Sequence, residues 1–136
     1  MIENSELIKL ALEARGMAYA PYSGFKVGAA LLTKEGKVYQ GCNIENAGYT
    51  PTNCAERTAF FKAVSEGERE FEAIAIVGGK GELPDDYAWP CGVCRQVMME
   101  FCDPKSFRVI TAVSETEFVE RTLSEMLPHG FGPNNL

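Results

Sequence analysis

The sequence predicts an α/β fold, namely a three-layer α/β/α sandwich with a mixed sheet of about five strands. Segments with apolar residues at helical spacing alternate along the chain with short strand-like runs. One run, residues 71–78, is mainly apolar and bounded by glycine, as expected for a strand covered on both faces. At 136 residues, 46% of them hydrophobic, the chain fits one domain, residues 1–136, with one core.

The first half predicts a helix followed by a β-hairpin. Apolar residues recur at helical spacing over residues 6–15, with Ser5 as the predicted N-cap and Gly16 near the end. Proline, glycine and serine in residues 17–25 predict an ordered loop. Two strand-like segments, residues 26–33 and 37–43, then flank a short turn. Three small residues in the first strand would let a helix pack closely, namely Gly28, Ala29 and Ala30.

A helix and a buried strand follow the hairpin. Thr52 or Asn53 is positioned to cap a helix over residues 54–64, which ends near Gly67. The strand at residues 71–78 comes directly after it. This order of strand, helix and strand predicts a βαβ crossover with parallel pairing.

The last third predicts a second helix and the closing strands. The helix covers about residues 92–102, and four of its side chains are expected to face the core: Val93, Val97, Met98 and Phe101. Residues 107–113 and the weaker pattern at 118–120 predict strands. Residues 123–127 predict a final helical turn that Pro128 ends.

The charge of the chain argues against polymeric DNA or RNA as a partner. The formal net charge is -6 and the isoelectric point is near 4.8, whereas affinity for phosphates comes from an excess of Lys and Arg. The first residues carry acids instead of a basic and then an apolar segment, and no apolar run approaches the length of a membrane span. We therefore expect a cytoplasmic protein that has no membrane partner.

The five cysteines suggest metal binding more than disulfides. In a reducing compartment such residues are more often buried, metal-bound or catalytic than cross-linked. Cys42 and Cys102 lie outside the motifs described next and are expected to be small buried hydrophobic side chains. Either of them remains open as a fourth metal ligand.

Two short motifs carry the candidate chemistry, Cys54-Ala55-Glu56 and Pro90-Cys91-Gly92-Val93-Cys94. Two residues three apart at a helix start share a face, so Cys91 and Cys94 can bind one Zn²⁺, with Cys54 coming from the neighbouring helix. Three protein ligands leave a position for water, which is the pattern of catalytic zinc. Glu56 would accept the proton that the activated water releases, then pass it to the substrate ring and the leaving amine.

The charge of such a site requires compensation. Three thiolates around Zn²⁺ leave a net charge of about -1. The two helix N-termini would offset part of it, because their dipoles and free backbone amides favour thiolates. Arg57 is the other candidate, since its guanidinium can donate hydrogen bonds to the sulfurs.

Alternative interpretations of the same motifs, without catalytic zinc, remain open at this point. A redox disulfide or a structural zinc knuckle would use the same Cys91-x-x-Cys94 spacing, and a glutamate at a helix start is usually a cap. A redox motif does not require Cys54 or Glu56, and a structural site should have a fourth ligand, for which His129 has no suggestive spacing. Catalytic zinc accounts for more of the residues.

Further sequence motifs, together with the two cysteine motifs, extend over nearly the whole chain. They are Ala20-Pro21-Tyr22-Ser23-x-Phe25-x-Val27-Gly28-Ala29-Ala30, Asn43-Ile44-Glu45-Asn46-Ala47, Cys54-Ala55-Glu56-Arg57-Thr58-Ala59, Pro90-Cys91-Gly92-Val93-Cys94-Arg95-Gln96 and Leu127-Pro128-His129-Gly130-Phe131-Gly132-Pro133. Together these segments resemble the small zinc-dependent cytidine deaminases, in the three-cysteine form of the zinc deaminase signature. The resemblance implies hydrolytic deamination of free cytidine, and of deoxycytidine, to the uridine analogues with release of ammonia, using one zinc ion per subunit.

The resemblance also implies roles for individual residues. Phe25 would stack on the pyrimidine, Asn43 and Glu45 would bind the ribose hydroxyls, and the Ala55 backbone would hold the base edge. On sequence alone, Phe25 could equally be a core residue, and Asn43 and Glu45 polar turn residues.

The resemblance further implies a closed homotetramer in which two residues reach a neighbouring subunit's active site, Tyr49 and Phe131. The single tryptophan, Trp89, is expected chiefly as a buried anchor, with shaping of the approach to the site as the alternative. Two other functions remain open: deamination of a modified cytosine nucleoside, such as a blasticidin-type antibiotic, and a non-catalytic structural zinc module.

Overall fold

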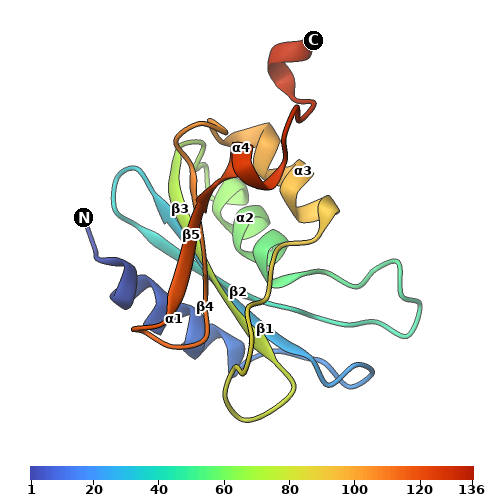
Figure 1. The fold of residues 1–136 in the computed structure, drawn as a ribbon. Coiled ribbons are helices and arrows are strands. Elements are labelled where there is room, and N and C mark those ends of the chain that lie inside the picture. The colour runs from blue at the N-terminus through green and yellow to red at the C-terminus, as the bar shows by residue number, and fades with distance from the viewer.

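The structure, a computed structural model, describes residues 1–136 and has the three predicted layers (Figure 1). The five strands of its single sheet are β1 (Lys26–Thr33), β2 (Val38–Cys42), β3 (Phe71–Gly79), β4 (Arg108–Ala112) and β5 (Phe118–Thr122). The helices are α1 (Asn4–Arg15), α2 (Ala55–Ser65), α3 (Gly92–Phe101), α4 (Leu123–Met126) and the 3-10 turn η1 (Pro133–Asn135). Helix α1 covers one face of the sheet, and α2 and α3 cover the other.

The sheet is mixed, in the order β2-β1-β3-β4-β5. Only β3 and β4 pair in parallel, and the other three pairs are antiparallel. The prediction of parallel pairing across α2 was therefore wrong in one respect. Strands β2 and β3 run in the same direction, but β1 inserts between them and pairs with both. The directly paired parallel strands are those joined through α3.

Strand alternation divides the apolar side chains between two cores. In β1, Ala29 and Leu31 pack toward α2 and α3, whereas Ala30 and Leu32 pack toward α1. Strands β3 and β4 alternate in the same way, which is the period of two that a strand imposes. Because both faces are buried, these strands read as continuous apolar runs in the sequence.

Glycines let both layers of helix lie directly on the sheet. A Cβ on Gly28 would overlap the Ala11 carbonyl oxygen of α1, and a Cβ on Gly41 would lie 2.5 Å from the Ala55 carbonyl oxygen of α2. The prediction that small residues allow close helix packing is confirmed at Gly28. Gly41 does the same for α2, and so sets the depth at which the start of α2 sits on the sheet.

Three local predictions were wrong. Helix α1 begins after Glu3, so Ser5 lies inside the helix instead of capping it. The N-cap of α2 is Cys54, and neither Thr52 nor Asn53 caps it. Val93 is exposed, because the inward face of α3 begins with Cys94 and continues to Met98. Neither helix start has a side-chain cap hydrogen bond.

None of the helices combines the length and the apolar content that a membrane-spanning helix requires.

Candidate zinc centre and substrate cavity

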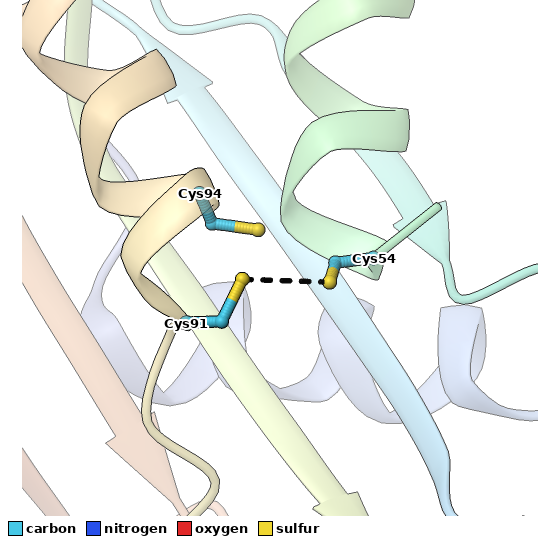
Figure 2. A group of neighbouring side chains, drawn as sticks. All are labelled: Cys54, Cys91 and Cys94. Carbon is cyan, nitrogen blue, oxygen red and sulfur yellow. Dashed lines mark hydrogen bonds between the residues drawn. The ribbon is translucent and has the colours of Figure 1, made fainter. Parts of the chain in front are cut away.

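The starts of α2 and α3 meet and bring three sulfur atoms together (Figure 2). Cys54 and Cys91 are the N-caps of the two helices, and Cys94 lies in the first turn of α3. The three Sγ atoms lie within 4.8 Å of one another, and Cys54 Sγ is 3.8 Å from Cys91 Sγ. A Zn–S bond of about 2.3 Å in a tetrahedron places two sulfurs roughly 3.8 Å apart. The donor set and its spacing therefore fit zinc, which Cys54, Cys91 and Cys94 would hold.

The electrostatics of the cluster favour a bound cation. Hydrogen bonds from Cys94 and Arg57 lower the pKa of Cys54 to about 5. The same contact with Cys54, together with burial, raises the pKa of the Cys94 thiol. One thiolate thus opposes ionisation of the next, because like charges at this distance repel. A divalent cation removes that repulsion, and so allows more than one sulfur to ionise.

Arg57 lies against this cluster as the sequence predicted. Its Nη2 donates to Cys54 Sγ at 3.3 Å. Burial alone would lower the pKa of Arg57, but hydrogen bonds to the sulfurs of Cys54 and Cys94 raise it. The guanidinium therefore stays charged and reduces the negative charge of the sulfurs. Its Nε is buried without a hydrogen-bond partner. Placing the guanidinium beside the sulfurs therefore costs the desolvation of this N–H group.

Glu56 is a carboxyl group held almost out of water beside the sulfurs. It follows the N-cap of α2 by two residues and is only 4% exposed. Burial, and then the negative charge of Cys54, raise its pKa to about 7. A carboxyl group with a pKa near neutral pH can both accept and release a proton during turnover. Cys54, and not Glu56, is the N-cap residue of α2, and Glu56 lies in the first turn of that helix.

A cavity of about 440 Å³ opens onto the zinc centre. Such a volume suits a small ligand, and the cavity has a mainly apolar lining with a few polar groups. Its walls include Cys54, Ala55, Glu56 and Cys91 from the helix starts. They also include the residues expected to hold a nucleoside, Phe25, Asn43 and Glu45. The structure therefore brings together three distant segments of the sequence around one space.

Asn43 and Glu45 hold the loop that carries Phe25. Asn43 accepts from the Val27 amide at 2.9 Å and donates to the Phe25 carbonyl oxygen at 2.8 Å. The Glu45 carboxylate accepts from the amide of Ser23 at 3.1 Å and also from the Ser23 hydroxyl. These hydrogen bonds lower the pKa of Glu45. Ser23 Oγ in turn accepts from the Phe25 amide at 2.9 Å, so both polar residues fix the aromatic side of the cavity.

The remaining residues singled out from the sequence lie away from the cavity or on its rim. Tyr49 and Phe131 are 77% and 57% exposed and do not line it. Cys42 and Cys102 are partly buried and lie outside the sulfur cluster, so neither is a fourth ligand. Trp89 is 42% exposed and lines the cavity, so the expectation of a buried anchor was wrong.

Several lining residues had no role in the sequence interpretation. Ser23 appears in the motif around Phe25, and its position there was the one available signal. Tyr87 and Ala88 line the cavity from the loop before α3, and Ile76 does so from β3. Nothing local in the sequence marks these residues, because their place depends on how the loop crosses the sheet.

A three-cysteine zinc centre beside a buried glutamate, on this α/β/α sandwich, defines the class of zinc deaminases. Residues 1–110 match the family model for the cytidine and deoxycytidylate deaminase zinc-binding region, so the chain belongs to that family.

Known proteins of the family are similar over almost the whole chain. The cytidine deaminase of Sporosarcina psychrophila is 50% identical over 131 residues, which cover 96% of this chain and 93% of that protein. The cytidine deaminase of Halalkalibacterium halodurans is 52% identical over 131 residues, covering 96% and 95%. The crystal structure of cytidine deaminase from Burkholderia pseudomallei superposes with a TM-score of 0.87 at 46% identity, covering 96% of this chain and 100% of that one.

Proposed function

We propose that this protein hydrolyses the exocyclic amine of free cytidine and deoxycytidine, giving uridine or deoxyuridine and ammonia. The observation that carries the proposal is the placement of Glu56, a buried carboxyl group beside three sulfurs, on the wall of a cavity the size of a small ligand. The relatives named above are cytidine deaminases, which supports cytidine as the substrate.

Zinc, when bound by the three sulfurs, supplies the Lewis acidity that makes water a nucleophile at neutral pH. Glu56 accepts the proton of that water and delivers it to the ring nitrogen next to the reacting carbon. It then takes the second proton of the water, from the oxygen now bonded to that carbon, and delivers it to the amine, so that the C–N bond breaks, ammonia leaves and the oxygen becomes the carbonyl of the product. Its pKa of about 7 suits these transfers, because neither the acid nor the base form is strongly disfavoured at neutral pH.

The other cavity residues bind and orient the nucleoside. Phe25 offers an aromatic face to the pyrimidine, and the backbone of Ala55 holds its edge next to Glu56. Asn43 and Glu45 hydrogen-bond the ribose hydroxyls with the capacity that remains beyond their loop contacts, since each carbonyl or carboxylate oxygen has two lone pairs.

The subunits assemble as a homotetramer in which Tyr49 and Phe131 reach a neighbouring active site. Both side chains are exposed and neither lines the cavity of its own chain. They lie in two segments that extend away from the three layers, the loop between β2 and α2 and the C-terminal segment (Figure 1). Exposed aromatic side chains on projecting segments suit contacts between copies.

The experiment compares wild type with Glu56→Ala, each with zinc quantified in the same preparation. Loss of ultraviolet absorbance is followed after adding cytidine, deoxycytidine or their monophosphates. We expect wild type to deaminate both nucleosides and Glu56→Ala to keep its zinc while losing about 10²- to 10⁴-fold in kcat. Glu100→Ala is the matched control, because Glu100 is exposed on α3 and does not line the cavity.

Two outcomes would contradict the proposed function or the role of Glu56. A zinc-loaded wild type that deaminates neither nucleoside favours a modified cytosine nucleoside as substrate or a structural zinc module. Equal activity of Glu56→Ala and wild type would refute the role given to the carboxylate.

A further inference from the structure

The backbone on both sides of Trp89 is anchored, whereas its indole ring is not. The Ala88 carbonyl oxygen accepts from the buried Thr111 hydroxyl at 2.9 Å, and the Pro90 carbonyl oxygen accepts from Arg95 Nε at 2.7 Å. The indole lies on the cavity wall with its ring centroid 6.4 Å from that of Tyr87. The Trp89 side chain therefore shapes the cavity without holding the wall in place.

The chemistry of the proposed reaction orients the pyrimidine relative to this wall. Carbon 4, which carries the amine, must lie beside the three sulfurs. Nitrogen 3 receives its proton from Glu56, so this edge of the ring faces the start of α2. Carbon 5 flanks carbon 4 on the opposite side of the ring. It therefore faces the segment that leads into α3, which contributes Cys91 on the far side of the cluster from Cys54 (Figure 2).

Space on that side is limited near the sheet. A Cβ built on Gly78 would lie 2.9 Å from the Ala88 Cβ and 3.1 Å from the Phe25 ring, so these two side chains approach the same point of β3. Ala88 thus leaves little room beside Phe25 there. Room for a ring substituent depends on the next side chain of the wall, which is Trp89.

We propose that Trp89 is a specificity-determining residue that limits the size of the group accepted at carbon 5 of the pyrimidine. The ligand class it would select against is cytosine nucleosides with bulky 5-substituents. This inference rests on the proposed deamination of cytidine, because that reaction orients the ring.

The test compares kcat/KM for cytidine, 5-methylcytidine and 5-bromocytidine in wild type, Trp89→Phe and Trp89→Ala. The readout is the ratio of each 5-substituted substrate to cytidine within one variant, which a general loss of stability or zinc does not change. We expect Trp89→Ala to raise the 5-bromocytidine ratio about tenfold or more, since contacts of this size contribute roughly 10- to 200-fold in discrimination. Trp89→Phe should raise it less.

The matched control is Phe61→Ala, which removes another exposed aromatic side chain outside the cavity and should leave the ratios unchanged. An unchanged ratio in Trp89→Ala, with cytidine turnover and zinc retained, overturns the inference. If Trp89→Ala does not fold, an unchanged ratio in Trp89→Phe overturns it equally. Wild type without cytidine turnover would instead refute the proposed function.

A binding measurement tests the same placement without turnover. Trp89 is the only tryptophan, so the tryptophan emission of the zinc-loaded protein reports on this wall alone. Uridine should change that emission, with the same saturation constant as its inhibition of cytidine deamination. Inhibition by uridine without a change in emission would contradict a contact between Trp89 and the ligand.

Discussion

At the scale of single residues, the site depends on a carboxyl group in an unfavourable place. Removing Glu56 from water disfavours its charged form, which is why its pKa rises from 4.5 to about 7. The same burial suits the group to the proton transfers proposed for it, because it brings the pKa close to neutral pH. Under that proposal, stability and function make opposite demands on this residue.

This opposition predicts how the stability of the metal-free protein depends on pH. The folded-state pKa of Glu56 is raised, so its favourable contribution is complete below about pH 4.5 and is lost as pH rises toward and beyond 7. Glutamine does not titrate. We expect the free energy of unfolding of Glu56→Gln to exceed that of wild type by up to about 3 kcal/mol at pH 8, and by much less at pH 5.

The measurement is urea unfolding of chelator-treated protein at both pH values. Glu100→Gln, on the exposed side of α3, is the control and should shift both curves equally. A stability difference between Glu56→Gln and wild type that is the same at pH 5 and pH 8 would show that the carboxyl group does not carry this penalty.

The sequence was sufficient to predict the zinc ligands but not the shape of the cavity. Cys54, Cys91 and Cys94 could be found because thiolate chemistry and helical spacing restrict their roles. The exposure of Trp89 could not be predicted, because it depends on where Thr111 and Arg95 hold the neighbouring backbone. The contact from Ser23 to Glu45 was missed for the same reason, since a loop brings them together across 22 residues.

At the scale of elements, the start of α2 carries Cys54, Ala55 and Glu56, and one glycine lies beneath it on the sheet. Gly41 lies directly under the first turns of α2, where a Cβ would be 2.5 Å from the Ala55 carbonyl oxygen and 2.6 Å from the Ala59 amide nitrogen. Gly28 has the corresponding position under α1, which carries no residue of the site. The two glycines therefore form a matched pair.

We expect Gly41→Ala and Gly28→Ala to lose similar stability, about 1 to 3 kcal/mol each, because both overpack a helix against the sheet. Gly41→Ala should also lower zinc affinity and kcat, since the backbone of Cys54, Ala55 and Glu56 must move with the helix. Urea unfolding, zinc titration and cytidine turnover separate the two effects. Equal zinc affinity and kcat in both variants would show that the site tolerates movement of α2.

Element types and approximate bounds were predictable, whereas strand neighbours were not. All five strands and the four α-helices appear close to their predicted segments, because period and glycine placement are local signals. Insertion of β1 between β2 and β3 follows from pairing over long sequence separations, which local pattern does not encode. Fold class was therefore more predictable than topology.

At the scale of the whole molecule, a single chain leaves parts of the family pattern without a local role. The Phe131 side chain is exposed, and the backbone carbonyl oxygen of Phe131 accepts a hydrogen bond from Gln96 Nε2 at 2.8 Å. The side chain is thus presented on a fixed backbone. The proposed tetramer gives it a function, because a closed assembly can place it over a neighbour's cavity.

Subunit mixing tests this arrangement. A Phe131→Ala chain keeps its own zinc centre and Glu56 but offers no aromatic side chain to its neighbour, so we expect its KM for cytidine to rise several-fold. A Glu56→Ala chain is inactive yet still presents Phe131. When the two are unfolded together and refolded as mixed assemblies, some Phe131→Ala sites receive Phe131 from a Glu56→Ala neighbour. Activity per Phe131→Ala chain at low cytidine should then exceed that of the Phe131→Ala protein alone.

Two controls accompany the mixing experiment. Light scattering should show four chains per assembly. A chain that carries both Phe131→Ala and Glu56→Ala, mixed with Phe131→Ala, should give no gain in activity. If mixing gives no gain although mixed assemblies form, Phe131 acts within its own chain or not at all.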